Sequence, residues 1–227
     1  MDTNLLTNNV LSALQALEND LNGYEELTSR LLLAAEGTVF PLDLLAISAL
    51  NRMINLTSGF DRMIRERNFI CAGAILRLQL DTSLRFFAAW QVQNPHSFAA
   101  SVVLDGTPVS KIKDRDGKHL SDRHLVNQLS KDFPWIETVY NRTCDYVHLS
   151  KTHFLFAVSA NPSDQDRAVD IRIGRGDPLH MPESIYLEAI DAFRNAASIL
   201  DHYLNGWIET KNRTHVTKSS AFDKPQT

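Results

Sequence analysis

The strongest structural signal in the chain is Phe69-Ile-Cys-Ala-Gly-Ala-Ile-Leu-Arg-Leu-Gln-Leu-Asp-Thr-Ser-Leu-Arg-Phe-Phe-Ala-Ala-Trp90. Its apolar residues surround almost the whole circumference of the helix that they predict over residues 69–92. Such a helix is typically enclosed by other elements, because it leaves little polar surface for water. We therefore expect it at the centre of a helical bundle.

Three charged residues interrupt this apolar segment. Arg77, Asp81 and Arg85 are spaced by four, so they share one face of the predicted helix. In one interpretation they form an ion-pair ladder in which Asp81 neutralises both arginines, since an unpaired buried charge is strongly destabilising. In the other, the two arginines line a pocket for a small anionic molecule. The sequence leaves both interpretations open.

Long amphipathic helices are expected at both ends of the chain. Apolar residues recur there at alternating spacings of four and three, which is typical of a helix that packs along one stripe. The first helix ends near Gly37, and the last extends from Pro182 to about Lys211. The two stripes either pack on each other within the chain or form the seam of a dimer. Their members are Val10, Leu14, Leu17, Leu21, Tyr24, Thr28 and Leu31, and Tyr186, Ile190, Phe193, Ala197, Leu200, Leu204 and Trp207.

Between these helices the pattern predicts shorter helices and one β-hairpin. Further helices are expected over residues 41–67, 95–104, 121–132 and 134–148. Apolar residues then alternate along residues 154–174, with a turn at 161–164, which predicts a small hairpin. The expected fold is mainly α, a multi-helix bundle in one domain over residues 1–211. A disordered polar tail is expected over residues 212–227.

The composition is that of a globular protein without an overall affinity for polyanions. Of the 227 residues, 44% are hydrophobic and 22% charged, and the formal net charge is −4. No apolar run reaches the ~20 residues of a membrane span, and the first nine residues lack the features of a signal peptide. Cys71 and Cys144 fall in helical patterns, which suits reduced thiols. We expect a cytoplasmic protein with no membrane contact.

One loop is locally cationic. Residues 108–118 contain Lys111, Lys113, Arg115 and Lys118, offset by Asp114 and Asp116. The loop is interpreted as a solvated surface, with a nucleic-acid contact as the alternative.

Motifs of the common cofactor and hydrolase classes are absent from the sequence. It has no P-loop, no Cys-x-x-Cys pair, no His-Glu-x-x-His and no Gly-x-Ser-x-Gly. His148 and His153 are poorly spaced for a metal pair on a helix, and no carboxylate cluster completes a ligand set. We expect no cofactor and no metal.

The most distinctive segment is Tyr140-Asn-Arg-Thr-Cys-Asp-Tyr-Val-His-Leu-Ser-Lys-Thr-His153. Tyr140, Cys144 and His148 form one stripe that ends at the helix terminus. Arg142 lies about 240° away from His148 around a straight helix. A joint site would need the helix to end early, a long reach by the arginine, or a second copy of the protein.

Arg142 and His148, with five residues between them, resemble the Arg-x(4 to 6)-His signature of the HEPN superfamily (higher eukaryotes and prokaryotes nucleotide-binding). The segments 74–86 and 146–150 are also similar to an uncharacterised group of bacterial helical proteins. The HEPN resemblance implies an all-helical fold. The superfamily includes metal-independent ribonucleases of toxin and phage-defence systems. In such an enzyme His148 would transfer a proton, and Arg142 would stabilise the transition-state charge.

The resemblance also implies roles for neighbouring residues. Asp145 would orient the imidazole of His148, and Tyr146 would stack on a base. The two sites of the family commonly meet across a dimer axis, which implies a homodimer. Thr143 follows the arginine where many members have Asn, Asp or His, and this departure bears on catalysis more than on fold.

The sequence thus predicts a non-catalytic HEPN-like module that binds RNA, a nucleotide or a partner protein. The first alternative is a ribonuclease with Arg142, His148 and Asp145 as catalytic residues. The second is an enzyme or sensor that binds a small anion at the face of Arg77. The candidate ligand-binding residues are Arg77, Asp81, Arg85, Tyr140, Tyr146, Ser150 and His153.

Overall fold

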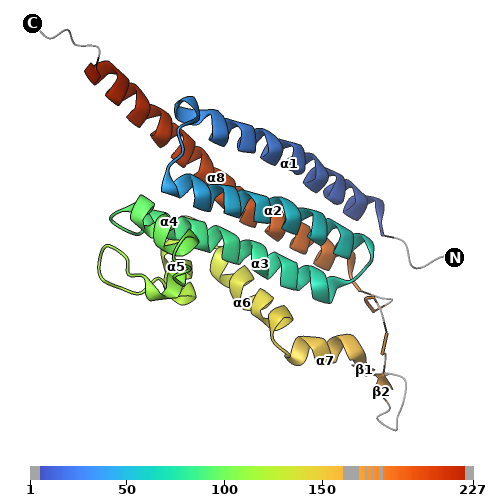
Figure 1. Ribbon diagram of the computed structural model, residues 1–227. Coiled ribbons are helices and arrows are strands. Elements are labelled where there is room, and N and C mark those ends of the chain that lie inside the picture. The colour runs from blue at the N-terminus through green and yellow to red at the C-terminus, as the bar shows by residue number, and fades with distance from the viewer. Residues whose placement is uncertain (1–5, 161–168, 172, 175, 179–180, 223–227) are drawn as a thin grey trace, which may run out of the picture.

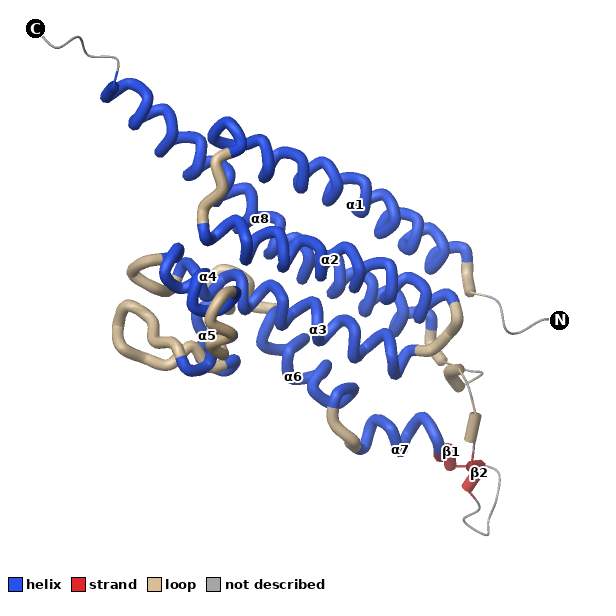
Figure 2. The backbone as a smooth tube through the Cα atoms, in the orientation of Figure 1, coloured by secondary structure: helices blue, strands red, loops and turns tan. Residues whose placement is uncertain are grey.

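The computed structural model describes residues 6–160, 169–171, 173–174, 176–178 and 181–222. Its α-helices are α1 (Asn8–Leu33), α2 (Pro41–Arg65), α3 (Phe69–Phe87), α4 (Pro95–Val103), α5 (Asp122–Leu129), α6 (Ile136–Val147), α7 (Lys151–Ala157) and α8 (Glu183–Phe222). Short 3₁₀ helices are η1 (Ala34–Gly37), η2 (Ala88–Trp90) and η3 (Val109–Lys111). The prediction of a mainly α multi-helix bundle is confirmed (Figures 1 and 2).

The central helix of the bundle is α3, as its apolar sequence predicts. It packs against α2, α5, α6 and α8, and the tube in Figure 2 runs between these neighbours. Leu80, Leu84 and Phe86 are almost completely buried. Beside α3, the rings of Phe60 on α2 and Phe193 on α8 stack with their centroids 4.4 Å apart. This stacked pair joins the helices on either side of the core.

The long terminal helices α1 and α8 pack on each other within the chain (Figure 1). Val10, Leu14 and Leu17 are buried in this contact and the core around it. An ion pair flanks this contact, in which Arg194 of α8 lies 2.7 Å from Asp20 of α1. The apolar stripe of α1 is therefore occupied inside the molecule and is not left over for a dimer seam.

The corner between α1 and α2 has an uncommon backbone. Ala35, Glu36 and Gly37 adopt φ angles of 52°, 55° and 76°, and left-handed geometry costs about 1–2 kcal/mol for each residue with a side chain. The C-terminal part of α8 supports this corner. The side-chain oxygen of Asn212 accepts a hydrogen bond from the backbone N–H of Ala35 at 2.8 Å.

The last helix is longer than predicted, because α8 continues to Phe222, beyond the expected end near Lys211 and into the segment expected as a disordered tail (Figure 1). No proline or glycine interrupts the chain between Trp207 and Phe222, and Arg213 pairs with Glu209 one turn earlier at 2.9 Å. The polar composition of this segment therefore did not mark the end of the helix.

The predicted hairpin is wrong for residues 154–157, which belong to α7. Ser150 caps this helix and accepts a hydrogen bond from the backbone N–H of Thr152 at 3.2 Å. A local N-cap of this kind favours a helix over the alternating pattern of Phe154 and Phe156. Two three-residue strands follow, β1 (Val158–Ala160) and β2 (Val169–Ile171), paired antiparallel. The turn expected at 161–164 lies outside the described residues.

Candidate functional site

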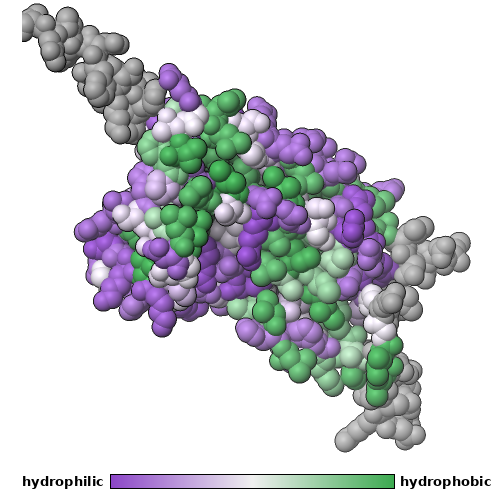
Figure 3. All heavy atoms as spheres, in the orientation of Figure 1, coloured by the Kyte–Doolittle hydropathy of each residue, from purple (hydrophilic) through white to green (hydrophobic). Residues whose placement is uncertain are grey.

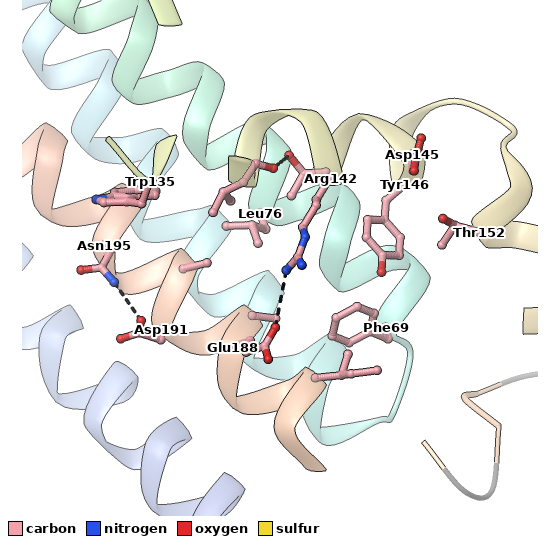
Figure 4. A pocket seen from close by; sticks show the side chains of 15 residues that line it. Phe69, Leu76, Trp135, Arg142, Asp145, Tyr146, Thr152, Glu188, Asp191 and Asn195 are labelled. Atoms are coloured by element: carbon pink, nitrogen blue, oxygen red, sulfur yellow. Dashed lines mark hydrogen bonds and ion pairs between the residues drawn. The ribbon is translucent and has the colours of Figure 1, made fainter. Parts of the chain in front are cut away.

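A groove with a volume of about 610 Å³ lies between α6 and α8, with α3 beneath it (Figure 4). Its apolar lining comes from α3, α8 and α6, and from Trp135, which directly precedes α6. This combination of an apolar floor and a few polar groups is typical of a binding site. The apolar lining residues are Phe69, Leu76, Trp135, Val139, Tyr146, Ile185, Ala189 and Ala192.

The N-terminus of α3 fixes one end of the groove. The buried carboxylate of Asp177 accepts a hydrogen bond from the backbone N–H of Phe69 at 2.8 Å and one from the hydroxyl of Tyr186 at 2.6 Å. Because Phe69 begins α3 and Tyr186 lies in the first turns of α8, one carboxylate ties the two helices together. Burial, and then this hydrogen bond, raise the pKa of Tyr186 to about 12.

The wall formed by α6 depends on a close approach to α3. A Cβ atom added to Gly73 would lie only 2.5 Å from Cγ of Tyr146. Tyr146 also contacts Phe69 edge to face, with the ring centroids 5.5 Å apart. Burial, and then the charge of Asp145, raise the pKa of the Tyr146 hydroxyl. The ring is therefore a neutral part of the groove wall, held in place by its packing.

The rim of the groove is predominantly acidic. Among the described residues that line it, Asp145, Glu188 and Asp191 carry negative charge and Arg142 alone carries positive charge. Arg142 on α6 forms an ion pair with Glu188 on α8, with 3.6 Å between Nη1 and Oε2, and the pair crosses the groove in Figure 4. The amide of Asn195 donates a hydrogen bond to Asp191 at 3.0 Å.

The structure separates the predicted catalytic residues. Arg142 and Asp145 line the groove, whereas His148 lies beyond the end of α6 as its exposed C-cap. The backbone N–H of His148 donates to the carbonyl of Cys144 at 3.1 Å. Within the described part of the chain, no hydrogen bond or ion pair connects the His148 imidazole to Arg142 or Asp145. Within one chain, the predicted proton-transfer residue and the predicted charge-stabilising residue are therefore not joined to each other.

Ser150 and His153 have a structural role at the start of α7. The Ser150 hydroxyl donates to the carbonyl of Asp145 at 2.8 Å, and the backbone N–H of Ser150 donates to Nδ1 of His153 at 3.3 Å. This reciprocal capping arrangement satisfies the helix terminus. Both residues thus hold the turn between α6 and α7.

The charged face of α3 has a carboxylate partner that its own sequence does not reveal. Asp122, at the start of α5, forms ion pairs with both Arg85 and Arg77, the latter at 3.5 Å. Asp81 lies 3.1 Å from Arg85, and it is 4.0 Å from Arg52 of α2. Each arginine of this network therefore has a carboxylate partner, which favours an ion-pair network over the anion pocket. The predicted ladder is corrected in one respect, because the ion-pair partner of Arg77 is Asp122 of α5 and not Asp81.

Tyr140 belongs to the same network. The guanidinium carbon of Arg77 lies 4.0 Å from the centre of the Tyr140 ring, and the Tyr140 hydroxyl donates to Asp122 at 3.4 Å. Burial raises the pKa of Tyr140, and the positive charge of Arg77 opposes this effect. Tyr140 therefore connects α6 to α3 and α5 outside the groove.

The cationic loop is tied back to the bundle. Arg115 donates hydrogen bonds to the carbonyls of Trp90 and Gln91. Asp114 lies 2.7 Å from Nε2 of His124 and accepts from the backbone N–H of Lys118 at 2.8 Å. Burial opposes the ionisation of Asp114, but the hydrogen bonds from Lys118 and His124 outweigh it and lower the pKa. This effect concerns the pKa of Asp114 alone. Of the cationic side chains, Arg115 is used within the protein, since its guanidinium binds two carbonyls of the bundle.

Sequence reasoning missed the contribution of α8 to the groove. Ile185, Glu188, Ala192 and Asn195 recur at spacings of three and four, and they line a second face of α8, beside the stripe that packs into the core. That spacing is the signal that could have identified this wall. It could not indicate that α6 lies opposite.

No known family model, curated protein or solved structure matches this chain. The HEPN resemblance therefore stays a prediction. Within the described ranges, no group of three or more His, Cys, Asp or Glu side chains is arranged to hold a metal ion. None of the helices, where the structure describes them, combines the length and apolar character of a membrane span.

Proposed function

We propose that this protein is a non-catalytic, HEPN-like module that binds an apolar segment of a partner protein in the groove between α6 and α8. The observation that carries this proposal is the apolar lining of the groove between the two helices, in which Trp135, Val139, Tyr146 and Ile185 are only partly buried. An open apolar groove between helices suits an amphipathic segment laid along it. The HEPN assignment, with its context of toxins or phage defence, rests on the Arg142 and His148 resemblance alone.

Exposed apolar side chains beyond one end of the groove support the proposal. Thr152 of α7 lines the groove, and large hydrophobic residues on and around α7 are exposed to solvent. Green surface gathers over the α7 and β1–β2 end of the molecule in Figure 3. Exposed apolar patches on soluble domains mark interaction surfaces. The residues are Val147, Leu149, Phe154, Leu155, Ile171 and Ile173.

The charge of the rim disfavours RNA and nucleotides as the occupant. Binding of a phosphate backbone depends on lysine and arginine side chains that replace counterions. Here Arg142 is paired with Glu188, and Asp145 and Asp191 add further negative charge. A protein segment therefore fits the groove better than a polyanion does.

The ribonuclease alternative depends on His148. His148 is exposed, and no described residue forms a hydrogen bond or ion pair with its imidazole. The imidazole therefore does not stabilise the fold of one chain through such a bond. In this alternative, a second copy of the protein would complete the catalytic pair with Arg142, in line with the dimers that the resemblance implies.

The proposal is tested by selecting a displayed peptide library against the wild-type protein. Ala192→Trp fills the groove from α8, and Ser198→Trp places the same side chain on an exposed part of α8 outside the groove. We expect selected peptides to carry an apolar stripe, to bind wild type and Ser198→Trp equally, and to lose at least about tenfold in affinity with Ala192→Trp. Peptides that bind all three proteins equally would contradict the proposal.

A further inference from the structure

We infer that the segment bound in the groove is an amphipathic helix with lysine or arginine beside its apolar stripe, and that these cations bind Glu188 and Asp191. This inference rests on the proposed function and specifies the chemistry of the partner. It follows from the shape of the groove, the placement of its carboxylates and the ion pair that crosses it.

The shape of the groove favours a helix. Its walls are α6 and α8, and its floor is the apolar face of α3 at Phe69 and Leu76. Trp135 and Tyr146 lie toward opposite ends of the apolar lining in Figure 4. A helix laid along such a floor inserts apolar side chains that recur every three or four residues, and it turns its charged flanks toward the rim.

The carboxylates lie where those flanks would meet the rim. Glu188 and Asp191 are three residues apart on α8, so both lie on the same side of the helix within one turn. Both residues are exposed. Complementary charges of this kind select a partner and its orientation more than they add affinity.

The ion pair across the groove shows what such a cation would do. The Arg142 guanidinium extends from α6 to Glu188 on α8, and the two side chains are 73% and 69% exposed. An ion pair this exposed contributes little stability. A cation of the partner can therefore take the place of Arg142 at Glu188. Arg142 then competes with the partner, and its removal strengthens binding.

The direction in which loss of Arg142 changes the affinity for the ligand separates this inference from the ribonuclease alternative. Loss of Arg142 would weaken the binding of a phosphate-containing ligand, because the guanidinium would be the group that contacts the phosphate. It strengthens the binding of a cationic helix, because the carboxylate of Glu188 is released. We expect Arg142→Gln to tighten that binding about two- to fivefold.

The experiment uses two labelled helical peptides with the same leucine stripe, one flanked by lysines and the other by glutamates. Fluorescence anisotropy measures their affinity for the full-length protein. We expect wild type to prefer the lysine peptide by about tenfold, and the preference to reverse in Glu188→Lys/Asp191→Lys. Glu25→Lys/Glu26→Lys changes the net charge equally on the exposed surface of α1, so it should retain the wild-type preference.

The outcomes distinguish this inference from the proposed function. Equal binding of both peptides, abolished by Ala192→Trp, would overturn the charge preference and leave the groove as a protein-binding site. If the Glu25→Lys/Glu26→Lys control lost the preference to the same extent, the inference would also be overturned, because the preference would then come from the net charge of the protein. Failure of both peptides to bind, or binding unaffected by Ala192→Trp, would overturn the inference and the proposed function together.

Discussion

The ammonium group of Lys211 lies 3.1 Å from the carboxylate of Asp43, and the two side chains are only 1% and 3% exposed. The pair connects the far part of α8 to the first turn of α2. Asp43 also accepts hydrogen bonds from the indole of Trp207 and from the backbone N–H of Phe40, both at 2.7 Å. Lys211 donates to the carbonyl of Leu31 at 3.2 Å. One buried pair therefore joins α1, α2 and α8.

Removal of one partner leaves the other as an uncompensated buried charge. We expect Asp43→Asn to lower the free energy of unfolding by about 3–5 kcal/mol, measured by urea denaturation. Glu209→Gln is the matched control, since it breaks an exposed ion pair with Arg213 and should cost less than about 1 kcal/mol. The double variant Asp43→Asn/Lys211→Met should recover part of the loss. A loss below that of the control would contradict a structural role for the pair.

Gly73 permits the close contact between α3 and the ring of Tyr146. Gly73→Ala places a methyl group 2.5 Å from that ring, so we expect a loss of about 1–3 kcal/mol and weaker binding in the groove. Gly206→Ala, also within a helix and with open space around its Cβ, should gain about 0.5–1 kcal/mol. Thermal unfolding compares the two variants. Equal effects would show that α6 can move away without cost.

Asp114 makes the stability of the cationic loop depend on pH. Its pKa is lowered in the folded protein, so the folded state binds the proton more weakly than the unfolded state does. The stabilisation is therefore present above the unfolded pKa of about 3.9, and it is lost as the pH falls through the lower folded value. Asp114→Asn should reduce stability at pH 7 and flatten its decline below about pH 4. An unchanged acid unfolding curve would refute this.

A binding module and a ribonuclease differ in their action on RNA. We expect wild type and His148→Ala, incubated with RNA in EDTA, to leave it equally intact, because no hydrogen bond or ion pair joins the His148 imidazole to Arg142 or Asp145 among the described residues. The fragment ends are examined for 2′,3′-cyclic phosphate. Cleavage by wild type that is lost in a folded His148→Ala protein would instead support the metal-independent ribonuclease.

The sequence was most informative where a local pattern determined the structure. The apolar circumference around Leu80 predicted a central helix, and the stripe that begins at Val10 predicted a helix packed along one side. The pattern failed at Phe154, because the capping by Ser150 outweighs the alternation of apolar residues. Short segments of this kind carry too few residues for periodicity to separate strand from helix.

The groove itself could be predicted only in part. Arg142, Asp145 and Tyr146 were identified as candidate residues, but their partners come from distant parts of the chain. The pairing of Arg77 with Asp122 and of Arg142 with Glu188 depends on how the helices cross. Spacing within one helix shows which residues share a face, and it contains no information about which helix lies opposite.

The left-handed corner at Ala35 and Glu36 constrains the order of folding during synthesis. Its backbone is supported by Asn212, and the nearby carbonyl of Leu31 is bound by Lys211. These partners lie 177 and 180 residues further along the chain, so both hydrogen bonds form only after the chain has been synthesised past Asn212. Until then, α1 and α2 can pack on each other, but the corner between them lacks the support of α8.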